Sequence, residues 1–163
     1  RASGTVAGDA RQLTTYQEEW KLPAKGTAEW NGDLKSGEGS FTAGDSISGA
    51  YSFRTRFEDA PGANPEQLIA GAHAACYSMA LSNVLAEGGN VPESVRTDAT
   101  VTLRLLDEGP TITRIDLVCR ARVPGASEDA FQAAAAAAKE GCPVSKALAG
   151  VEEVTLDATL EAS

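Results

Sequence analysis

The sequence contains few of the residues that build metal sites and disulfide frameworks. Its 163 residues include one histidine and three cysteines, which are Cys76, Cys119 and Cys142. Three scattered cysteines are too few for a disulfide framework, and with one histidine they lack the ligand spacing of a structural zinc site. Neither glycine-rich phosphate loop, GxGxxG or GxxxxGK(S/T), occurs. We therefore expect no metal, no cofactor and cysteines that stay reduced in the cytoplasm.

Basic residues are also scarce. Lys and Arg number 14 against 23 Asp and Glu, which gives a formal charge of −9. Such a chain is repelled by phosphate backbones and anionic lipid surfaces, so we expect neither nucleic acid nor membrane as a partner. The least polar stretch, 68–85, is interrupted by His73 and Ser78, and we expect no membrane span there. Residues 1–16 lack the apolar segment of a secretory signal.

The hydrophobic content of 42% is enough for one soluble domain with its own core. Residues 1–24 are polar and contain glycines, so we expect an N-terminal arm there and a single domain over 25–163. Within that domain, the pair Asn31-Gly32 predicts a hairpin turn between short strands, the second of which starts at Leu34. In the segment 51–57, three aromatic residues and Thr55 alternate with Ser52, Arg54 and Arg56, which predicts a strand with the arginines on the face opposite the aromatics.

A change of period predicts a long helix after these strands. Asn64 fits an N-cap, Pro65 the first helical position, and Glu66 the first turn, where the helix dipole favours a carboxylate. Gly88-Gly89 supplies the stop. Gly71 and the alanines beside it leave little bulk at the centre of this helix. Such a surface permits close packing against another helix.

The second half of the chain predicts a hairpin, two helices and a closing strand. The strands 95–106 and 111–123 are joined by the turn sequence DEGP. Ser127 caps a helix that runs through consecutive alanines to Gly141, Pro143 begins a short helix to Leu148, and 154–160 alternates as a strand. Hairpins mixed with helices, without regular βαβ repeats, indicate an α+β fold.

The three cysteines differ in their predicted environments. Cys142 precedes Pro143 and fits a helix N-cap, where orphan N–H groups favour the thiolate. Cys76 lies mid-helix among alanines, where burial raises a thiol's pKa, so it needs a cation from elsewhere to act as a nucleophile. His73 on the same face is one candidate, and a neutral histidine packed beside the thiol is the simpler interpretation. Cys119 falls on the apolar face of a strand and is expected to be inert core.

The segments around Cys76 and Cys142 resemble a known family. Three segments are similar to the OsmC/Ohr family: NPEQLIAGAHAACYSMALS at 64–82, GCPVSKAL at 141–148 and TRFE at 55–58. A histidine at position 73 resembles the OsmC branch of this family more than the Ohr branch. The resemblance covers about 25–160. It implies an OsmC-like α+β fold, in which antiparallel sheets wrap around long central helices in an intertwined homodimer.

The same resemblance implies a thiol-dependent peroxidase that reduces organic hydroperoxides to alcohols in oxidative or osmotic stress defence. Cys76 matches the family's peroxidatic cysteine and Cys142 its resolving cysteine. Arg56 matches the arginine that activates the thiolate, and Glu66 the carboxylate that holds this arginine. The implied partners are a second copy of the chain, the hydroperoxide, and an external dithiol reductant, with a lipoyl protein among the candidates.

Spacing constrains how these four residues can meet. Glu66 and Cys76 are ten positions apart, which on one straight helix means a rise of about 15 Å. They serve one site only if the helix breaks between them or if Glu66 comes from another chain. We favour the second arrangement, a composite site at a dimer interface.

Two other functions remain open at this point. Cys76 and His73 could act as a thiol hydrolase or acyl-transfer pair. The chain could also be a non-catalytic dimer that binds a small apolar ligand or serves a structural role under stress. Unreactive thiols would favour that non-catalytic function.

Overall fold

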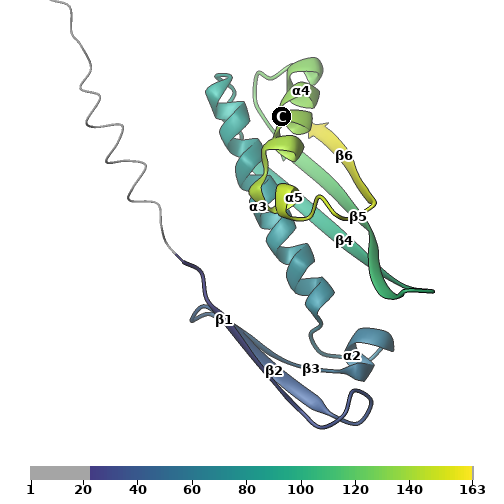
Figure 1. Ribbon diagram of the computed structural model, residues 1–163. Coiled ribbons are helices and arrows are strands. Elements are labelled where there is room, and N and C mark those ends of the chain that lie inside the picture. The colour runs from purple at the N-terminus through teal and green to yellow at the C-terminus, as the bar shows by residue number, and fades with distance from the viewer. Residues whose placement is uncertain (1–22, 163) are drawn as a thin grey trace, which may run out of the picture. The chain divides into compact units, whose positions relative to one another are not determined.

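A computed structural model describes residues 23–162 (Figure 1). The described chain forms two compact units, divided between Ser52 and Phe53. The predicted arm, 1–24, lies almost wholly outside the described residues.

The first unit is a three-stranded antiparallel sheet in the order β1-β2-β3. Its strands are β1 (Gly26–Asn31), β2 (Glu38–Ala43) and β3 (Ile47–Ser52). The predicted hairpin is confirmed, but the strand start at Leu34 is wrong, because the loop after Asn31 is longer than a two-residue turn. Asp33 closes this loop by accepting hydrogen bonds from the backbone N–H groups of Lys35 and Ser36 at 2.8 and 3.1 Å.

The first sheet buries none of its strand residues. Trp30 and Phe41 each pack against the ring of Tyr51, at centroid distances of 5.3 and 6.2 Å. A sheet of three strands gains stability from a hydrophobic face or from packing against a helix.

The second unit begins with a helical turn where we predicted a strand. Phe53–Phe57 forms the short helix α2. The alternating pattern fits a helix as well, since Phe53 and Phe57 are neighbours at i, i+4 and their rings lie 4.8 Å apart. Asn64 also donates from its side chain to the carbonyl of Thr55 at 3.0 Å. Arg54 and Arg56 therefore do not share a strand face, and Arg54 pairs instead with Glu58.

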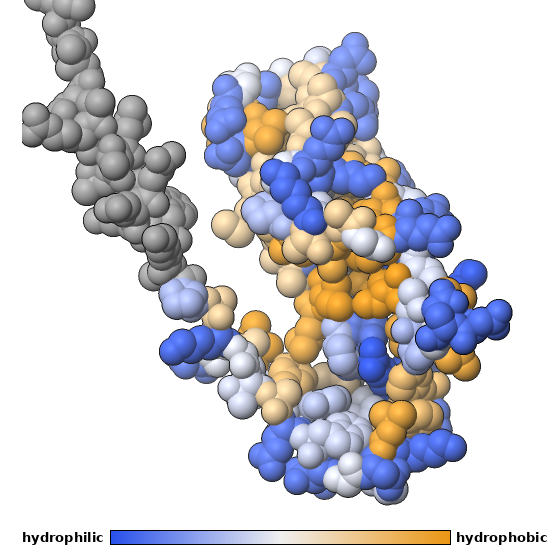
Figure 2. All heavy atoms as spheres, viewed as in Figure 1, coloured by the Kyte–Doolittle hydropathy of each residue, from blue (hydrophilic) through white to orange (hydrophobic). Residues whose placement is uncertain are grey.

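The long helix α3 (Pro65–Glu87) is confirmed with its predicted start. Asn64 is the N-cap and forms a capping box with Gln67. The buried residues of α3 form one stripe: Glu66, His73, Tyr77, Leu81 and Leu85. The other side of α3 stays exposed, and Met79 retains 75% of its accessible surface. Figure 2 shows hydrophobic residues gathered on the visible surface of this unit.

By length and composition, α3 also qualifies as a membrane-spanning helix, with a mean hydropathy of 1.3. Core helices of soluble proteins meet the same test, so this property alone has little weight. The absence of a membrane partner stays a prediction.

The second sheet has the order β4-β5-β6, with β4 (Ser94–Leu106), β5 (Gly109–Arg122) and β6 (Glu153–Glu161). β4 and β5 form the predicted antiparallel hairpin. β6 lies parallel to β5, because α4 (Glu128–Gly141) and α5 (Pro143–Ala147) form a crossover between them. The predicted α+β class and both hairpins are confirmed.

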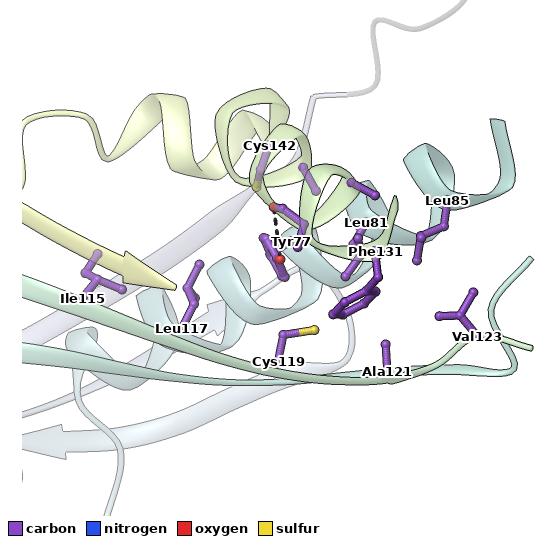
Figure 3. Packing of buried hydrophobic residues seen from close by; sticks show 13 residues of the cluster. Tyr77, Leu81, Leu85, Ile115, Leu117, Cys119, Ala121, Val123, Phe131 and Cys142 are labelled. Carbon is purple, nitrogen blue, oxygen red and sulfur yellow. Dashed lines mark hydrogen bonds between the residues drawn. The ribbon is translucent and has the colours of Figure 1, made fainter. Parts of the chain in front are cut away.

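The core of the second unit lies between this sheet and its helices (Figure 3). Residues at alternate positions of β5, from Ile115 to Ala121, are fully buried, so the helices cover one face of the sheet. α3 contributes Tyr77 and Leu81, and α4 contributes Phe131. This packing fixes α3 against α4 and α5, which determines where the cysteines of these segments meet.

Candidate active site

The fold brings the thiols of Cys76 and Cys142 together. Cys76 lies in the middle of α3 and Cys142 immediately precedes α5, and the two thiols are close enough for each to shift the pKa of the other. Cys76 is half-buried and Cys142 fully buried, and both are free thiols. A reagent from solvent therefore meets Cys76 first.

The two thiols have opposite pKa shifts. Burial raises the pKa of Cys76, the Val144 N–H lowers it, and the Cys142 thiol raises it further, so the net direction is upward. Burial also raises the pKa of Cys142, but Ser145, Cys76 and Val144 together outweigh burial and bring it below its ordinary value. Within one chain, Cys142 therefore loses its proton more readily than Cys76.

Cys142 is the N-cap of α5, as predicted. Its sulfur makes no capping hydrogen bond of regular geometry. The N–H groups of Val144 and Ser145 are nevertheless near enough to lower the pKa of Cys142. The direction of this pKa shift agrees with the predicted preference for the thiolate.

His73 is bonded to α5 and not to the Cys76 thiol. Its Nε2 lies 2.8 Å from the hydroxyl oxygen of Ser145, and the imidazole is fully buried. Burial lowers the pKa of His73 and the charge of Lys139 lowers it further, so the ring is neutral near pH 7. This geometry favours the neutral, packed histidine over a catalytic pair with Cys76.

Arg56 and Glu66 form an ion pair within one chain. Nη2 of Arg56 lies 2.8 Å from Oε1 of Glu66, and Nε lies 3.2 and 3.3 Å from the two carboxylate oxygens. Glu66 is buried, whereas the Arg56 side chain keeps 35% of its surface exposed. Nη1 of Arg56 donates no hydrogen bond to Glu66. The guanidinium is thus fixed along one edge and open along another.

The cysteine pair and the arginine pair lie at different places along α3. Glu66 is in its first turn and Cys76 near its middle, and the helix runs unbroken between them. Ten residues of helix rise about 15 Å. One chain therefore does not bring all four predicted residues to one point, and the helix break that would have allowed it is absent from α3.

Arg56 and Glu66 also line an open hollow of about 490 Å³. Its other walls come from the start of α3 and from β4, including Ala70, Ala99 and Val101. The free edge of the guanidinium is thus accessible.

Two further residues near the site are Cys119, which the sequence singled out, and Ser145, which it did not. Cys119 is fully buried, which confirms its predicted place in the core, and burial raises its pKa. Ser145 was missed. A signal was present, since Ser145 lies three residues after the predicted N-cap Cys142, and residues at this spacing meet in capping boxes.

Comparison with known proteins identifies the family. The family model described as OsmC-like protein matches residues 57–157, more than half of the chain. The chain belongs to the OsmC-like family. This OsmC-like chain is 45% identical over 139 residues to peroxiredoxin OsmC of Escherichia coli (strain K12), covering 84% of this chain and 96% of that protein. It is 35% identical over 95 residues to the organic hydroperoxide resistance protein OhrA of Bacillus subtilis (strain 168), covering 58% and 65%.

Solved structures confirm the predicted OsmC-like fold. An organic hydroperoxide resistance protein OsmC from Legionella pneumophila superposes with a TM-score of 0.66 at 24% identity, covering 86% of this chain and 100% of that chain. The organic hydroperoxide resistance protein OhrB of Bacillus subtilis superposes with a TM-score of 0.64 at 26% identity, covering 85% and 98%.

Proposed function

We propose that this chain reduces organic hydroperoxides to alcohols, with Cys76 as the peroxidatic and Cys142 as the resolving cysteine. The coarser role, a cysteine-based peroxidase, follows from the relatives named peroxiredoxin OsmC and organic hydroperoxide resistance protein. One observation carries the assignment of residues. Two free thiols meet at the start of α5, the accessible one from α3 and the buried one from the cap.

The proposed cycle has two steps in the protein. The Cys76 thiolate attacks the distal peroxide oxygen, the O–O bond breaks, and the departing alkoxide takes a proton to give the alcohol. Cys76 is left as a sulfenic acid. The Cys142 thiolate then attacks the Cys76 sulfur, which forms a disulfide and expels hydroxide that becomes water on protonation. An external dithiol, for which a lipoyl protein is our candidate, reopens the disulfide by exchange.

The raised pKa of Cys76 supports a cation supplied by a second chain. A peroxidatic cysteine reacts as the thiolate, and a guanidinium within about 4–6 Å favours that form. Arg56 cannot supply it to Cys76 of its own chain while Glu66 holds it at the first turn of α3. We infer that Arg56 and Glu66 act on Cys76 of a second copy in a homodimer.

The exposed side of α3 supports packing against a second copy of the chain. Leu68 and Met79 are 37% and 75% exposed, and a side chain added at Gly71 would meet nothing within 4 Å. The surface between them consists of small residues, which allow helix backbones to approach closely. The first sheet buries none of its strand residues, which also suits packing against a partner surface.

Organic hydroperoxides are the proposed substrates because of the surroundings of Cys76. Ala72 and Ala80 lie one helical turn before and after Cys76 on α3, and the thiol packs against the hydrophobic core. Such a site accommodates an alkyl chain better than strongly hydrated hydrogen peroxide. The Bacillus subtilis relative is named for organic hydroperoxide resistance.

Peroxide consumption in the presence of an excess small dithiol tests this function. We expect faster turnover of cumene hydroperoxide than of hydrogen peroxide, and loss of both activities in Cys76→Ser. Cys119→Ser is the matched control, because Cys119 is a buried thiol of the same chain outside the pair. Full activity in Cys76→Ser, or faster turnover of hydrogen peroxide, would refute the proposal.

A further inference from the structure

His73 and Ser145 form a pair behind Cys142 that the cycle above does not use. His73 comes from α3 and Ser145 from α5, and Nε2 and Oγ lie 2.8 Å apart. Cys142 is the N-cap of α5, and Ser145 is the third residue of that helix. N-cap and third-residue side chains lie beside each other at a helix start. The three groups therefore follow one another in the order imidazole, hydroxyl, thiol.

The tautomer of His73 determines which group is the donor in each hydrogen bond of this series. Nδ1 is buried and has no hydrogen-bond partner among the described residues. A buried N–H without an acceptor is rarer and more costly than an unused lone pair, so the proton of the neutral ring belongs on Nε2. The Nε2–H then donates to Ser145 Oγ, and the hydroxyl hydrogen of Ser145 is free to point elsewhere.

We propose that His73 is a positioning residue for the resolving cysteine, because it turns the Ser145 hydroxyl so that its O–H donates to the Cys142 sulfur. This inference rests on the peroxidase function proposed above. The donated hydrogen bond stabilises Cys142 as the thiolate that attacks the sulfenic acid of Cys76. The thiol proton goes to solvent, the sulfur's electron pair forms the S–S bond, and hydroxide leaves.

The charges around the pair fit a donor role for His73. Lys139 from α4 helps keep the imidazole neutral, so the ring does not take the thiol proton. Cys76 from α3 also lowers the pKa of Cys142, and Cys142 in turn raises the pKa of Tyr77. Ser145 lowers the pKa of Cys142 through both its backbone N–H and its hydroxyl. It also lines an open groove of about 720 Å³, so the released proton has a route to solvent.

The ionisation of Cys142 can be measured without any peroxidase activity. The probe is ¹³Cβ-labelled cysteine, followed by NMR through a pH titration of the full chain carrying Cys76→Ser. Ser145→Ala removes the hydroxyl, and Ser145→Thr retains it. His73→Leu removes the imidazole, and His73→Gln retains an N–H donor. Ser78→Ala is the matched control, because it deletes another half-buried hydroxyl, bonded to Thr97 at 2.8 Å.

We expect Ser145→Ala and His73→Leu each to reduce the Cys142 thiolate about tenfold at a fixed pH below its pKa, while Ser145→Thr and His73→Gln restore it. In chains that retain Cys76, the same two losses should slow disulfide formation about tenfold without slowing the first oxidation of Cys76. An unchanged Cys142 titration in Ser145→Ala or in folded His73→Leu, or an equal change in Ser78→Ala, overturns the inference. If His73→Leu does not fold, the ¹⁵N chemical shifts of the wild-type imidazole decide the role of His73, because a proton on Nδ1 instead of Nε2 overturns the inference. Failure of wild-type chain to react with hydroperoxide would refute the peroxidase function separately.

Discussion

A chain that lacks Arg56 should be rescued by a second copy that lacks Cys76. Arg56 is fixed to Glu66 by three N–H···O contacts of 2.8–3.3 Å at the start of α3. An unbroken helix carries Cys76 about 15 Å further on, which exceeds the roughly 4–6 Å over which a guanidinium stabilises a thiolate. If the site is composite, one chain supplies the arginine and the other the cysteines.

The test uses mixed dimers of Arg56→Ala and Cys76→Ser chains, purified through two different tags. Each variant alone should be inactive towards cumene hydroperoxide. A mixed dimer contains one complete composite site out of two, so it should recover about half of the wild-type rate. The control is a mixed dimer of the double variant, Arg56→Ala with Cys76→Ser, and the Arg56→Ala chain. It dimerises in the same way but contains no complete site, so it should stay inactive. If the site formed within one chain, no site in the mixed dimer would be complete, and the absence of recovery would refute the composite arrangement.

Three further predictions concern stability. Asn64→Ala removes the N-cap of α3 and should lower the unfolding free energy by about 1 kcal/mol in urea titrations, and an unchanged midpoint would contradict the capping account. Leu81→Ala opens a cavity at a fully buried site and should cost about 3 kcal/mol, measured in the same way, whereas a loss below about 1 kcal/mol would contradict its place in the core. The pKa of His73 is lower in the folded chain than the ordinary 6.5 of the unfolded chain, so on acidification the unfolded chain takes up the His73 proton first. The unfolding free energy that depends on neutral His73 is therefore fully present above pH 6.5 and falls as the pH drops below it. His73→Gln should lose this acid sensitivity, and an identical pH profile for both proteins would contradict the burial of a neutral imidazole.

The sequence predicted elements whose signals are local. Asn64, Pro65 and Gly88 bound the long helix as expected, because a cap and a stop act on the backbone beside them. The segment 53–57 was misassigned, because alternation of aromatic and basic residues fits either period. The choice depended on contacts with residues further along, such as the bond from Asn64 to the Thr55 carbonyl.

In the candidate site, too, the local features were predictable from the sequence and a contact between distant segments was not. Cys142 at a helix cap was visible from Pro143 beside it, and the ten-residue spacing already excluded a site shared by Glu66 and Cys76 on one helix. The contact of His73 with Ser145 joins residues 72 positions apart. No local pattern determines such a contact, because it depends on how α3 packs against α5.

The central claim is that Cys76 and Cys142 act in sequence on a hydroperoxide. The most direct measurement is a count of free thiols in the reduced protein before and after one equivalent of cumene hydroperoxide per chain, with the sites mapped by mass spectrometry. We predict that the wild-type chain loses two thiols to a Cys76–Cys142 disulfide, Cys142→Ser loses one, and Cys76→Ser loses none. No loss in the wild-type chain, or a loss confined to Cys142 in Cys76→Ser, would contradict the claim.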